Sequence, residues 1–170
     1  MLIKNTIFLL FLAGGDVSTT SYFEKGYCQG KPFYFSAIEL PMKEAATGEK
    51  VILESKAADK FKDMIADAAK EGFYIGINHS YRTHHEQRIL KRRKGELAAK
   101  AGWSTHQMGK SVDIIGTRRK IKGKYYRTIL FWWLKRNGPK HGFYNDVPGE
   151  SWHWTYYEEA SKAVLKRSKR

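Results

Sequence analysis

Apolar residues recur at helical spacing over residues 55–72. They follow the i, i+3, i+4 pattern of a single helix face and are Ala57, Ala58, Phe61, Met64, Ile65, Ala68 and Ala69. Ser55 stands where an N-cap is expected, and Gly72 stands where such a helix usually ends. The pattern predicts an amphipathic helix that buries one face in the core.

A buried strand and a second helix are predicted to follow. Residues 73–77 form an apolar run of strand length. Thr83 and Glu86 have the spacing of a capping box, in which a hydroxyl and a carboxylate satisfy free amides at a helix start. Arg82 is therefore expected at a strand-to-helix junction, where side chains project into clefts. An ordinary surface arginine is the alternative.

Turn residues and apolar runs predict the remaining elements. Residues 22–54 alternate aromatic residues with turn formers, which is typical of short strands and loops. Residues 128–137 predict a largely buried helix, closed by Gly138 and Pro139, with its aromatic side chains in the core.

Candidate chemistry is concentrated in two short segments, residues 104–114 and 150–154. Gly109 and the apolar run around Asp113 favour a turn and a strand over a helix, so His106 and Asp113 can converge on one ion. A lone histidine is usually a structural residue. An aspartate within an apolar strand is harder to explain that way, because a buried carboxylate is costly unless it is paired or bound to metal.

In the second segment, alternate residues of a strand point to opposite faces. His153 can then face a cleft while Trp152 and Trp154 pack in the core. Glu150 has the wrong parity for the strand, so we expect it on the bend at Gly149, near the ion without being a ligand. Nitrogen and oxygen ligands with a nearby base are the parts of a zinc peptidase site.

Length and charge limit these hypotheses. A chain of 170 residues fits one domain with a full core. Its 31 Lys and Arg against 17 Asp and Glu give a net charge of +14, which predicts attraction to nucleic acid, an acidic membrane surface or an anionic cell-wall polymer. The basic clusters at 91–94, 118–124 and 166–170 also fit a solvated helix face and a frayed end. Cys28 is the single cysteine, which excludes an intramolecular disulfide.

The N-terminal segment, residues 1–20, has one lysine, an apolar run over 6–13 and then small residues. This resembles a short secretory signal and falls well short of a membrane span. A strand or helix packed on the core is the alternative. We expect a signal segment at 1–20 and a single zinc peptidase domain at 21–170.

A family resemblance rests on both segments together. The pattern Ser-x-His-x-x-Gly-x-x-x-Asp, from Ser104 to Asp113, is followed by Glu-x-Trp-His from Glu150. It resembles the VanY-type D-alanyl-D-alanine carboxypeptidases, zinc peptidases grouped with lysostaphin-like enzymes and the hedgehog signalling domain. Residues 81–83 and Gln87 are similar to the family's Tyr-Arg-Ser and downstream Gln. The resemblance runs from about residue 55 to 157.

The resemblance implies a role for each site residue. The zinc ligands that it implies are His106, Asp113 and His153. Glu150 would be the catalytic base, and Arg82 would hold the substrate or the developing oxyanion. Gln87 and Ser104 would line the substrate site. The implied fold is α+β, a small antiparallel sheet with helices packed against it, as in hedgehog and D,D-peptidase domains.

Two departures from the family pattern concern the predicted substrate pocket: His79 and Ser80 replace Ser-Gly, and Ser111 replaces Ala. We expect a zinc-dependent hydrolase of peptidoglycan stem peptides, acting on a D,D or L,D bond in the cell envelope, periplasmic or secreted. An endolysin-like peptidoglycan endopeptidase and a non-catalytic zinc-binding module are the alternatives. Nucleic-acid binding is disfavoured, because no zinc-finger, RNP or Gly-rich phosphate pattern is found.

Overall fold

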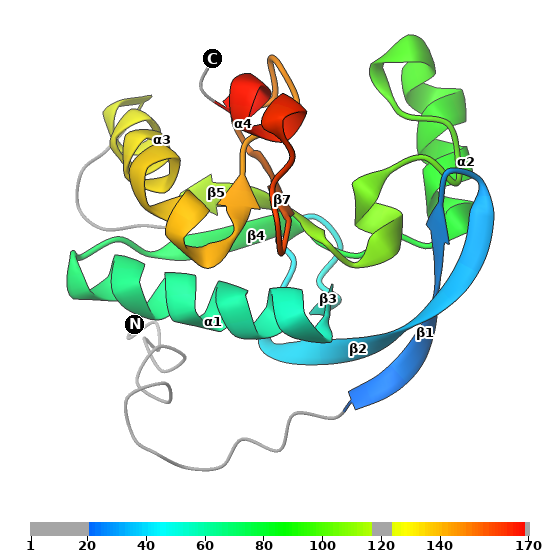
Figure 1. Cartoon of the computed structure of the whole chain (residues 1–170), viewed down its shortest axis with the longest axis horizontal. Coiled ribbons are helices and arrows are strands. Elements are labelled where there is room, and N and C mark those ends of the chain that lie inside the picture. The colour runs from blue at the N-terminus through cyan, green and yellow to red at the C-terminus, as the bar shows by residue number, and fades with distance from the viewer. Residues whose placement is uncertain (1–20, 117–123, 169–170) are drawn as a thin grey trace, which may run out of the picture.

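The computed structural model describes residues 21–116 and 124–168 of the chain. The expected signal segment and most of the basic cluster at 118–124 lie outside the described residues. Two antiparallel sheets are accompanied by helices (Figure 1), which is the α+β architecture predicted from the sequence.

The first sheet has three strands in chain order, β1 Ser21–Cys28, β2 Lys31–Lys43 and β3 Lys50–Glu54. The second has the order β4-β5-β7-β6, with β4 Ile75–His79, β5 Ser111–Gly116, β6 Phe143–Tyr144 and β7 His153–Tyr156. The helices are α1 Ser55–Lys70, α2 His84–Lys94, α3 Lys124–Asn137 and α4 Lys162–Ser168. Short 3₁₀ turns are η1 Gly95–Leu97, η2 Thr105–Met108 and η3 Gly138–His141. Among the described helices, none has the length and apolar character needed to span a membrane.

Helix α1 is capped by Glu54 and not by Ser55 as predicted. Glu54 ends β3 in an extended conformation, so its carboxylate reaches forward and accepts a hydrogen bond from the Ala57 amide at 3.1 Å. The helix ends at Lys70, close to the predicted stop. Gly72 follows with a φ of +79°, a left-handed conformation that favours glycine.

The main core lies where α1 faces strands of both sheets and the inner side of α3 (Figure 1). The buried face of α1 consists of Ala57, Ala58, Phe61, Met64 and Ala68, all on the predicted apolar stripe. Phe61 packs its ring 5.6 Å from that of Phe143 in β6. Burying a large apolar side chain of this kind contributes about 1.5–3 kcal/mol. The sheet that carries the second sequence motif is thereby fixed against α1.

Helix α2 begins with the predicted capping box. The Thr83 hydroxyl accepts a hydrogen bond from the Glu86 amide at 3.2 Å, and the Glu86 carboxylate accepts one from the Thr83 amide at 2.8 Å. The preceding strand starts at Ile75, two residues later than predicted. Phe73 instead packs its ring 5.8 Å from that of Trp133 in α3.

Two tryptophans are more exposed than the sequence pattern predicts. Helix α3 starts at residue 124 rather than 128, and only one of its sides faces the core: Trp133 is 2% exposed and Trp132 is 62% exposed. Trp152 was expected in the core but is 48% exposed, because β7 begins only at His153 and Trp152 lies in the turn before it. These aromatic side chains are therefore available at the surface.

The β1–β2 hairpin is longer than the short strands predicted for this region, and it extends beside α2 (Figure 1). It packs closely on η2. A Cβ on Gly26 would lie 2.9 Å from the Gln107 carbonyl oxygen, so only glycine fits there. The Tyr81 hydroxyl also donates a hydrogen bond to the Lys25 carbonyl at 2.8 Å. The hairpin thus supports the turn that carries His106.

Candidate active site

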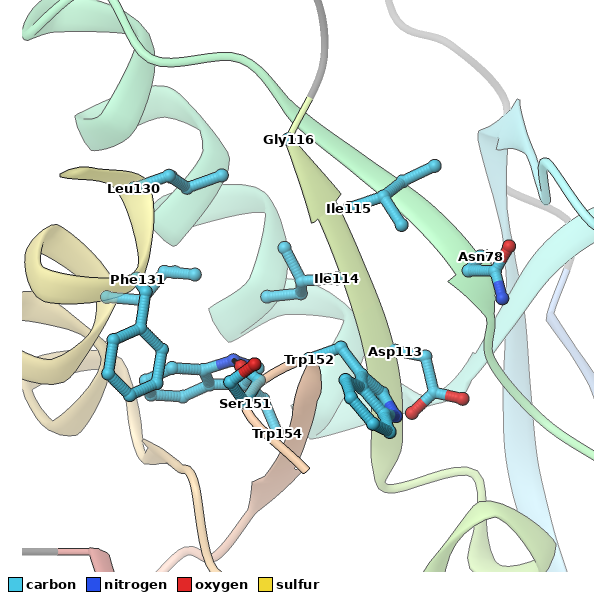
Figure 2. A pocket seen from close by; sticks show the side chains of 11 residues that line it. Asn78, Asp113, Ile114, Ile115, Gly116, Leu130, Phe131, Ser151, Trp152 and Trp154 are labelled. Carbon is cyan, nitrogen blue, oxygen red and sulfur yellow. Dashed lines mark hydrogen bonds between the residues drawn. The ribbon is translucent and has the colours of Figure 1, made fainter. Parts of the chain in front are cut away.

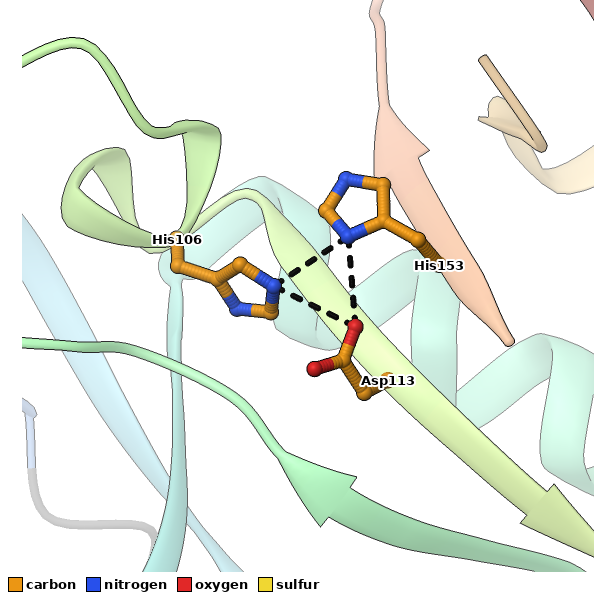
Figure 3. Close-up of side chains that lie close together, drawn as sticks. All are labelled: His106, Asp113 and His153. Atoms are coloured by element: carbon orange, nitrogen blue, oxygen red, sulfur yellow. Dashed lines mark hydrogen bonds and ion pairs between the residues drawn. The ribbon is translucent and has the colours of Figure 1, made fainter. Parts of the chain in front are cut away.

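His106, Asp113 and His153 converge from η2, β5 and β7 (Figure 3). In the β5–β7 pairing Asp113 lies directly opposite His153, and Asp113 Oδ1 is 3.2 Å from His153 Nδ1. The turn η2 ends at Gly109 in a left-handed conformation, which returns the chain into β5 and brings His106 over the same point. His106 Nε2 is 3.3 Å from Asp113 Oδ1 and 3.2 Å from His153 Nδ1.

The hydrogen bond of the other ring nitrogen fixes the tautomer of His106. Its Nδ1 lies 2.6 Å from the Ser80 carbonyl oxygen, which can only accept, so Nδ1 carries the proton. Nε2 then presents a lone pair to Asp113 and His153. Burial lowers the pKa of His106 below its ordinary value, which keeps the ring neutral.

The three converging atoms form a set of electron-pair donors suited to a metal cation. Burial acts to raise the pKa of Asp113, but its interactions with the imidazoles of His106 and His153 outweigh burial and hold the pKa well below its ordinary value. Asp113 is therefore a carboxylate. Ligand atoms about 2.0–2.1 Å from a tetrahedral zinc lie roughly 3.3–3.4 Å apart. The observed separations of 3.2, 3.2 and 3.3 Å fit that geometry closely.

A cluster of buried hydroxyl groups lies behind His153. His153 Nε2 is 3.0 Å from Thr155 Oγ1, two residues along the same strand face. Ser111 Oγ lies 2.9 Å from Thr155 Oγ1 and donates to Thr105 Oγ1 at 2.6 Å. Asp146 Oδ1, which is buried without a hydrogen-bond partner, is 3.9 Å from His153 Nε2. A ring that binds a cation through Nδ1 can therefore donate its Nε2 proton to Thr155, the kind of contact that orients metal-binding histidines.

Arg82 lies beside the three-residue cluster at the β4–α2 junction, as predicted. Its Nη1 donates to Gln87 Oε1 at 2.8 Å, and its Nη2 is 4.0 Å from Asp113 Oδ2. Burial lowers the pKa of Arg82, whereas Asp113 and Glu150 act to raise it. The guanidinium is still charged at neutral pH, because the ordinary pKa of arginine is so high. Its side chain is 13% exposed, so the charge faces the site and not bulk water.

Glu150 lies in the bend between the 147–149 turn and the turn that precedes β7. Its carbonyl oxygen accepts hydrogen bonds from the His153 amide at 3.0 Å and from Asn145 Nδ2 at 2.7 Å, which fix the backbone of the bend. Its carboxylate interacts electrostatically with His153, Asp113 and Arg82 but is not one of the three converging groups. Burial is the main cause that raises the pKa of Glu150 above its ordinary value.

A hollow of about 610 Å³ opens beside Asp113 (Figure 2), within the size range of small-molecule sites. Asp113 and Trp152 lie at one end of it, and Leu130 and Phe131 of α3 lie at the other. The hollow therefore joins a polar, charged end to an apolar end.

Residues 50–159, more than half of the 170-residue chain, match the family model for VanY, D-alanyl-D-alanine carboxypeptidase. The chain belongs to the VanY family. The match includes every predicted site residue and leaves the β1–β2 hairpin and the residues up to 49 outside it.

Two curated relatives are similar in sequence to this VanY-family chain. A D-alanyl-D-alanine carboxypeptidase of Enterococcus faecium is 30% identical over 128 residues, 68% of this chain and 41% of the relative. A relative in Bacillus subtilis (strain 168) is 25% identical over 154 residues, 76% of this chain and 56% of the relative. The chain thus spans about half the length of these curated relatives.

The solved structures share the fold. One is a variant of the vancomycin resistance D,D-pentapeptidase VanY in complex with Zn(II), with a TM-score of 0.56 and 21% identity, covering 78% of this chain and 85% of that one. The other is the LdcB LD-carboxypeptidase, with a TM-score of 0.60 and 24% identity, covering 78% of this chain and 72% of that one.

Some of the predicted site residues of this VanY-family chain lie in or near the converging cluster, whereas Gln87 and Ser104 do not belong to it. His106, Asp113 and His153 converge, with Arg82 and Glu150 near them. Gln87 is 1% exposed. Its Oε1 accepts a hydrogen bond from Arg82, and its Nε2 donates one to the Ala99 carbonyl at 2.7 Å. Ser104 precedes η2 and accepts the Gln107 amide on its carbonyl at 3.1 Å. Gln87 thus supports Arg82 from behind.

The two serines among the departures from the family pattern lie behind the histidines. Ser80 is 1% exposed and Ser111 is 0% exposed, so neither lines an open pocket, whereas the His79 side chain is 34% exposed. Both serines belong to the hydrogen-bond network behind His106 and His153. The sequence analysis missed this network, although the shared strand face of His153 and Thr155 was a signal for part of it.

Proposed function

We propose that the chain is a zinc-dependent peptidase that hydrolyses peptidoglycan stem peptides as a D-alanyl-D-alanine or L,D carboxypeptidase. The observation that carries the proposal is the convergence of two imidazole nitrogens and one carboxylate oxygen at 3.2–3.3 Å from one another, with Arg82 and Glu150 beside them. Membership of the VanY family supports it. So do the Zn(II) complex of one structural neighbour and the D-Ala-D-Ala complex of another, VanYB.

Two nitrogen ligands and one oxygen ligand are a donor set typical of catalytic zinc, which keeps a further position open. Zinc held by His106, Asp113 and His153 would acidify a water molecule and polarise the scissile carbonyl. The three residues are 3%, 8% and 4% exposed, so the charges interact in a poorly solvated environment. This environment strengthens the electrostatic part of catalysis.

Glu150 has the properties of a general base for this reaction. It would take a proton from the attacking water and pass it to the amine of the leaving residue. Its raised pKa, caused mainly by burial, brings the carboxyl closer to the pH at which proton transfer in both directions is efficient. The hydrogen bonds that the Glu150 carbonyl accepts from the His153 amide and from Asn145 Nδ2 keep the bend in place while the carboxyl exchanges the proton.

Arg82 would bind the negative charge of the substrate. Its guanidinium can grip a terminal carboxylate in a bidentate manner or stabilise the oxyanion that develops on the attacked carbonyl. The hydrogen bond to Gln87 at 2.8 Å holds the guanidinium plane in one orientation. This pre-arrangement lowers the entropic cost of binding.

The hollow beside Asp113 gives the rest of the peptide a place to bind. Its apolar end at Leu130 and Phe131 suits aliphatic parts of a stem peptide, and Trp152 can cover the scissile peptide bond near Asp113. A net charge of +14 suits an anionic cell-wall polymer around the substrate. We accordingly propose that the protein acts in the cell envelope, periplasmic or secreted.

Mass spectrometry of stem pentapeptides and tetrapeptides incubated with the zinc-loaded protein tests this function. A D,D carboxypeptidase removes the terminal alanine of the pentapeptide and an L,D carboxypeptidase removes that of the tetrapeptide, whereas the endopeptidase alternative predicts cleavage within cross-linked dimers. Zinc binding without any hydrolysis of monomeric or cross-linked peptides would favour the non-catalytic module and contradict the proposal.

A further inference from the structure

Glu44 is a buried carboxylate outside the family-matched region. It follows β2 in the connection to β3 and is 7% exposed. Its backbone amide donates to the Glu49 carbonyl at 2.8 Å, which closes the connection into a tight loop. A buried carboxylate is unfavourable unless hydrogen-bond donors satisfy it. The identity of those donors is therefore informative.

Two of the donors belong to one residue, Ser80. Glu44 Oε1 accepts the Ser80 amide at 2.6 Å and the Ser80 hydroxyl at 2.5 Å, while Oε2 accepts the Thr47 hydroxyl at 2.8 Å. His79 Nδ1 lies 3.7 Å from Oε2. Burial acts to raise the pKa of Glu44, but the nearby His79 and the hydrogen bonds from Ser80 and Thr47 outweigh it, and the pKa lies below its ordinary value. Glu44 is therefore an ionised acceptor at neutral pH.

Ser80 connects this carboxylate to His106. The β4–β5 pairing is irregular between Ile77 and His79, so the chain leaves the regular sheet just before Ser80. The Ser80 hydroxyl also accepts the Ile52 amide at 3.0 Å, which ties the residue to β3. With its amide and hydroxyl both held, Ser80 presents its carbonyl to His106 Nδ1 at 2.6 Å.

We propose that Glu44 is a positioning residue of the metal site, acting through Ser80 to hold His106 in the Nδ1–H tautomer with Nε2 directed at Asp113 and His153. Glu44 touches neither the converging atoms nor the hollow, so it acts on the His106 ring through the Ser80 peptide, while its charge also interacts with Arg82. The importance of this for metal binding rests on the proposed function, whereas the control of the tautomer does not. Carboxylate or carbonyl partners of this kind keep a ligand ring oriented before metal arrives.

The first test uses metal-free protein. Ring ¹⁵N resonances distinguish the two tautomers of a neutral histidine, and the His106 signals are identified by their loss in His106→Gln. The wild-type ring should be held in the Nδ1–H form. Glu44→Ala should produce a mixture of tautomers, whereas Glu49→Ala, which removes an exposed carboxylate from the same loop, should match wild type.

The second test measures zinc affinity by competition with a chelating dye. Glu44→Ala should weaken Zn²⁺ binding by about 10–100-fold, as is typical when a partner behind a metal ligand is lost. Glu44→Gln should recover part of that loss, because its amide oxygen can still accept from Ser80. Should Glu44→Ala fail to fold, Ser80→Ala takes its place, since it keeps the carbonyl but loses the hydroxyl bonds to Glu44 and Ile52.

A folded variant with the wild-type tautomer and wild-type zinc affinity would overturn the proposal, even if its melting temperature were lower. A wild-type protein that binds no zinc would instead refute the proposed function, and the metal-free tautomer measurement would still decide the role of Glu44.

Discussion

Asp113 and His153 lie directly opposite each other on the antiparallel strands β5 and β7, with Oδ1 of one 3.2 Å from Nδ1 of the other. The register of the sheet therefore determines that these two side chains meet. A slip of one residue would turn one of the two side chains to the opposite face. Trp154, which is 0% exposed on the other face of β7, opposes that slip because it would lose its place in the core. The metal site and the core thus depend on the same register.

The first prediction concerns metal binding. Zinc at about 100 times its dissociation constant should raise the free energy of unfolding by about 2.7 kcal/mol, because it binds the folded chain and not the unfolded one. Asp113→Asn should lose most of this stabilisation, whereas Asp63→Asn, an exposed change on α1, should retain it. Denaturation with and without zinc measures the effect. Equal stabilisation of wild type and Asp113→Asn would exclude Asp113 as a ligand.

Arg82→Lys should fold normally and lose turnover by about 10²–10³-fold. A lysine carries the charge, but it cannot keep the hydrogen bond to Gln87 and also present a planar fork to the substrate. Steady-state kinetics on a stem pentapeptide measure the loss, with Arg88→Lys in α2 as the matched control. Unchanged kinetics for Arg82→Lys would show that Arg82 has no part in substrate binding or catalysis.

Thr155→Val should weaken zinc binding by roughly 10–100-fold, because it removes the hydroxyl that lies 3.0 Å from His153 Nε2. Valine has nearly the same shape, so the cavity cost is small. Val51→Ala is the control, since it destabilises the core at a 0% exposed position away from the site. If both variants lowered zinc affinity equally, general destabilisation and not the lost hydroxyl would be the cause.

Stability should depend on pH through Glu44. Its folded-state pKa is below the ordinary value, so the unfolded chain binds more protons in the interval between the two values. The contribution is fully present above the unfolded pKa, about 4.3, and is lost as the pH falls through the folded pKa. The unfolding free energies of wild type and Glu44→Gln should therefore differ at about pH 7 and converge as the pH falls through the folded pKa of Glu44. A difference that grows on acidification would contradict this sign.

Much of the site could be predicted from the sequence because its chemistry is local in the chain. The turn at Gly109, the capping box at Thr83 and the strand alternation around His153 each depend on a few neighbouring residues. These patterns indicated which side chains could meet before the fold was known. The roles assigned to them remain predictions.

Other features depend on contacts between distant segments, and the sequence could not predict them. Glu44 meets Ser80 across 36 positions, so no local spacing pointed to it. The hydrophobic pattern predicted α3, but it did not show which side of the helix packs against other elements. Trp132 was for that reason wrongly expected in the core. The residue type of Ser55 favoured it as the N-cap, but β3 extends to Glu54, and Glu54 is the N-cap instead.

Glu150 is proposed to be a catalytic base beside the metal and not one of its ligands. Glu150→Ala removes the carboxylate and leaves His106, Asp113 and His153 in place. Zinc content and stem-peptide hydrolysis should be measured on the same preparation. We expect one zinc per chain, an unchanged fold and hydrolysis reduced by a factor of about 10²–10⁴ or more. Loss of the zinc would show that Glu150 is a ligand, and full activity with the zinc retained would show that it is not the base.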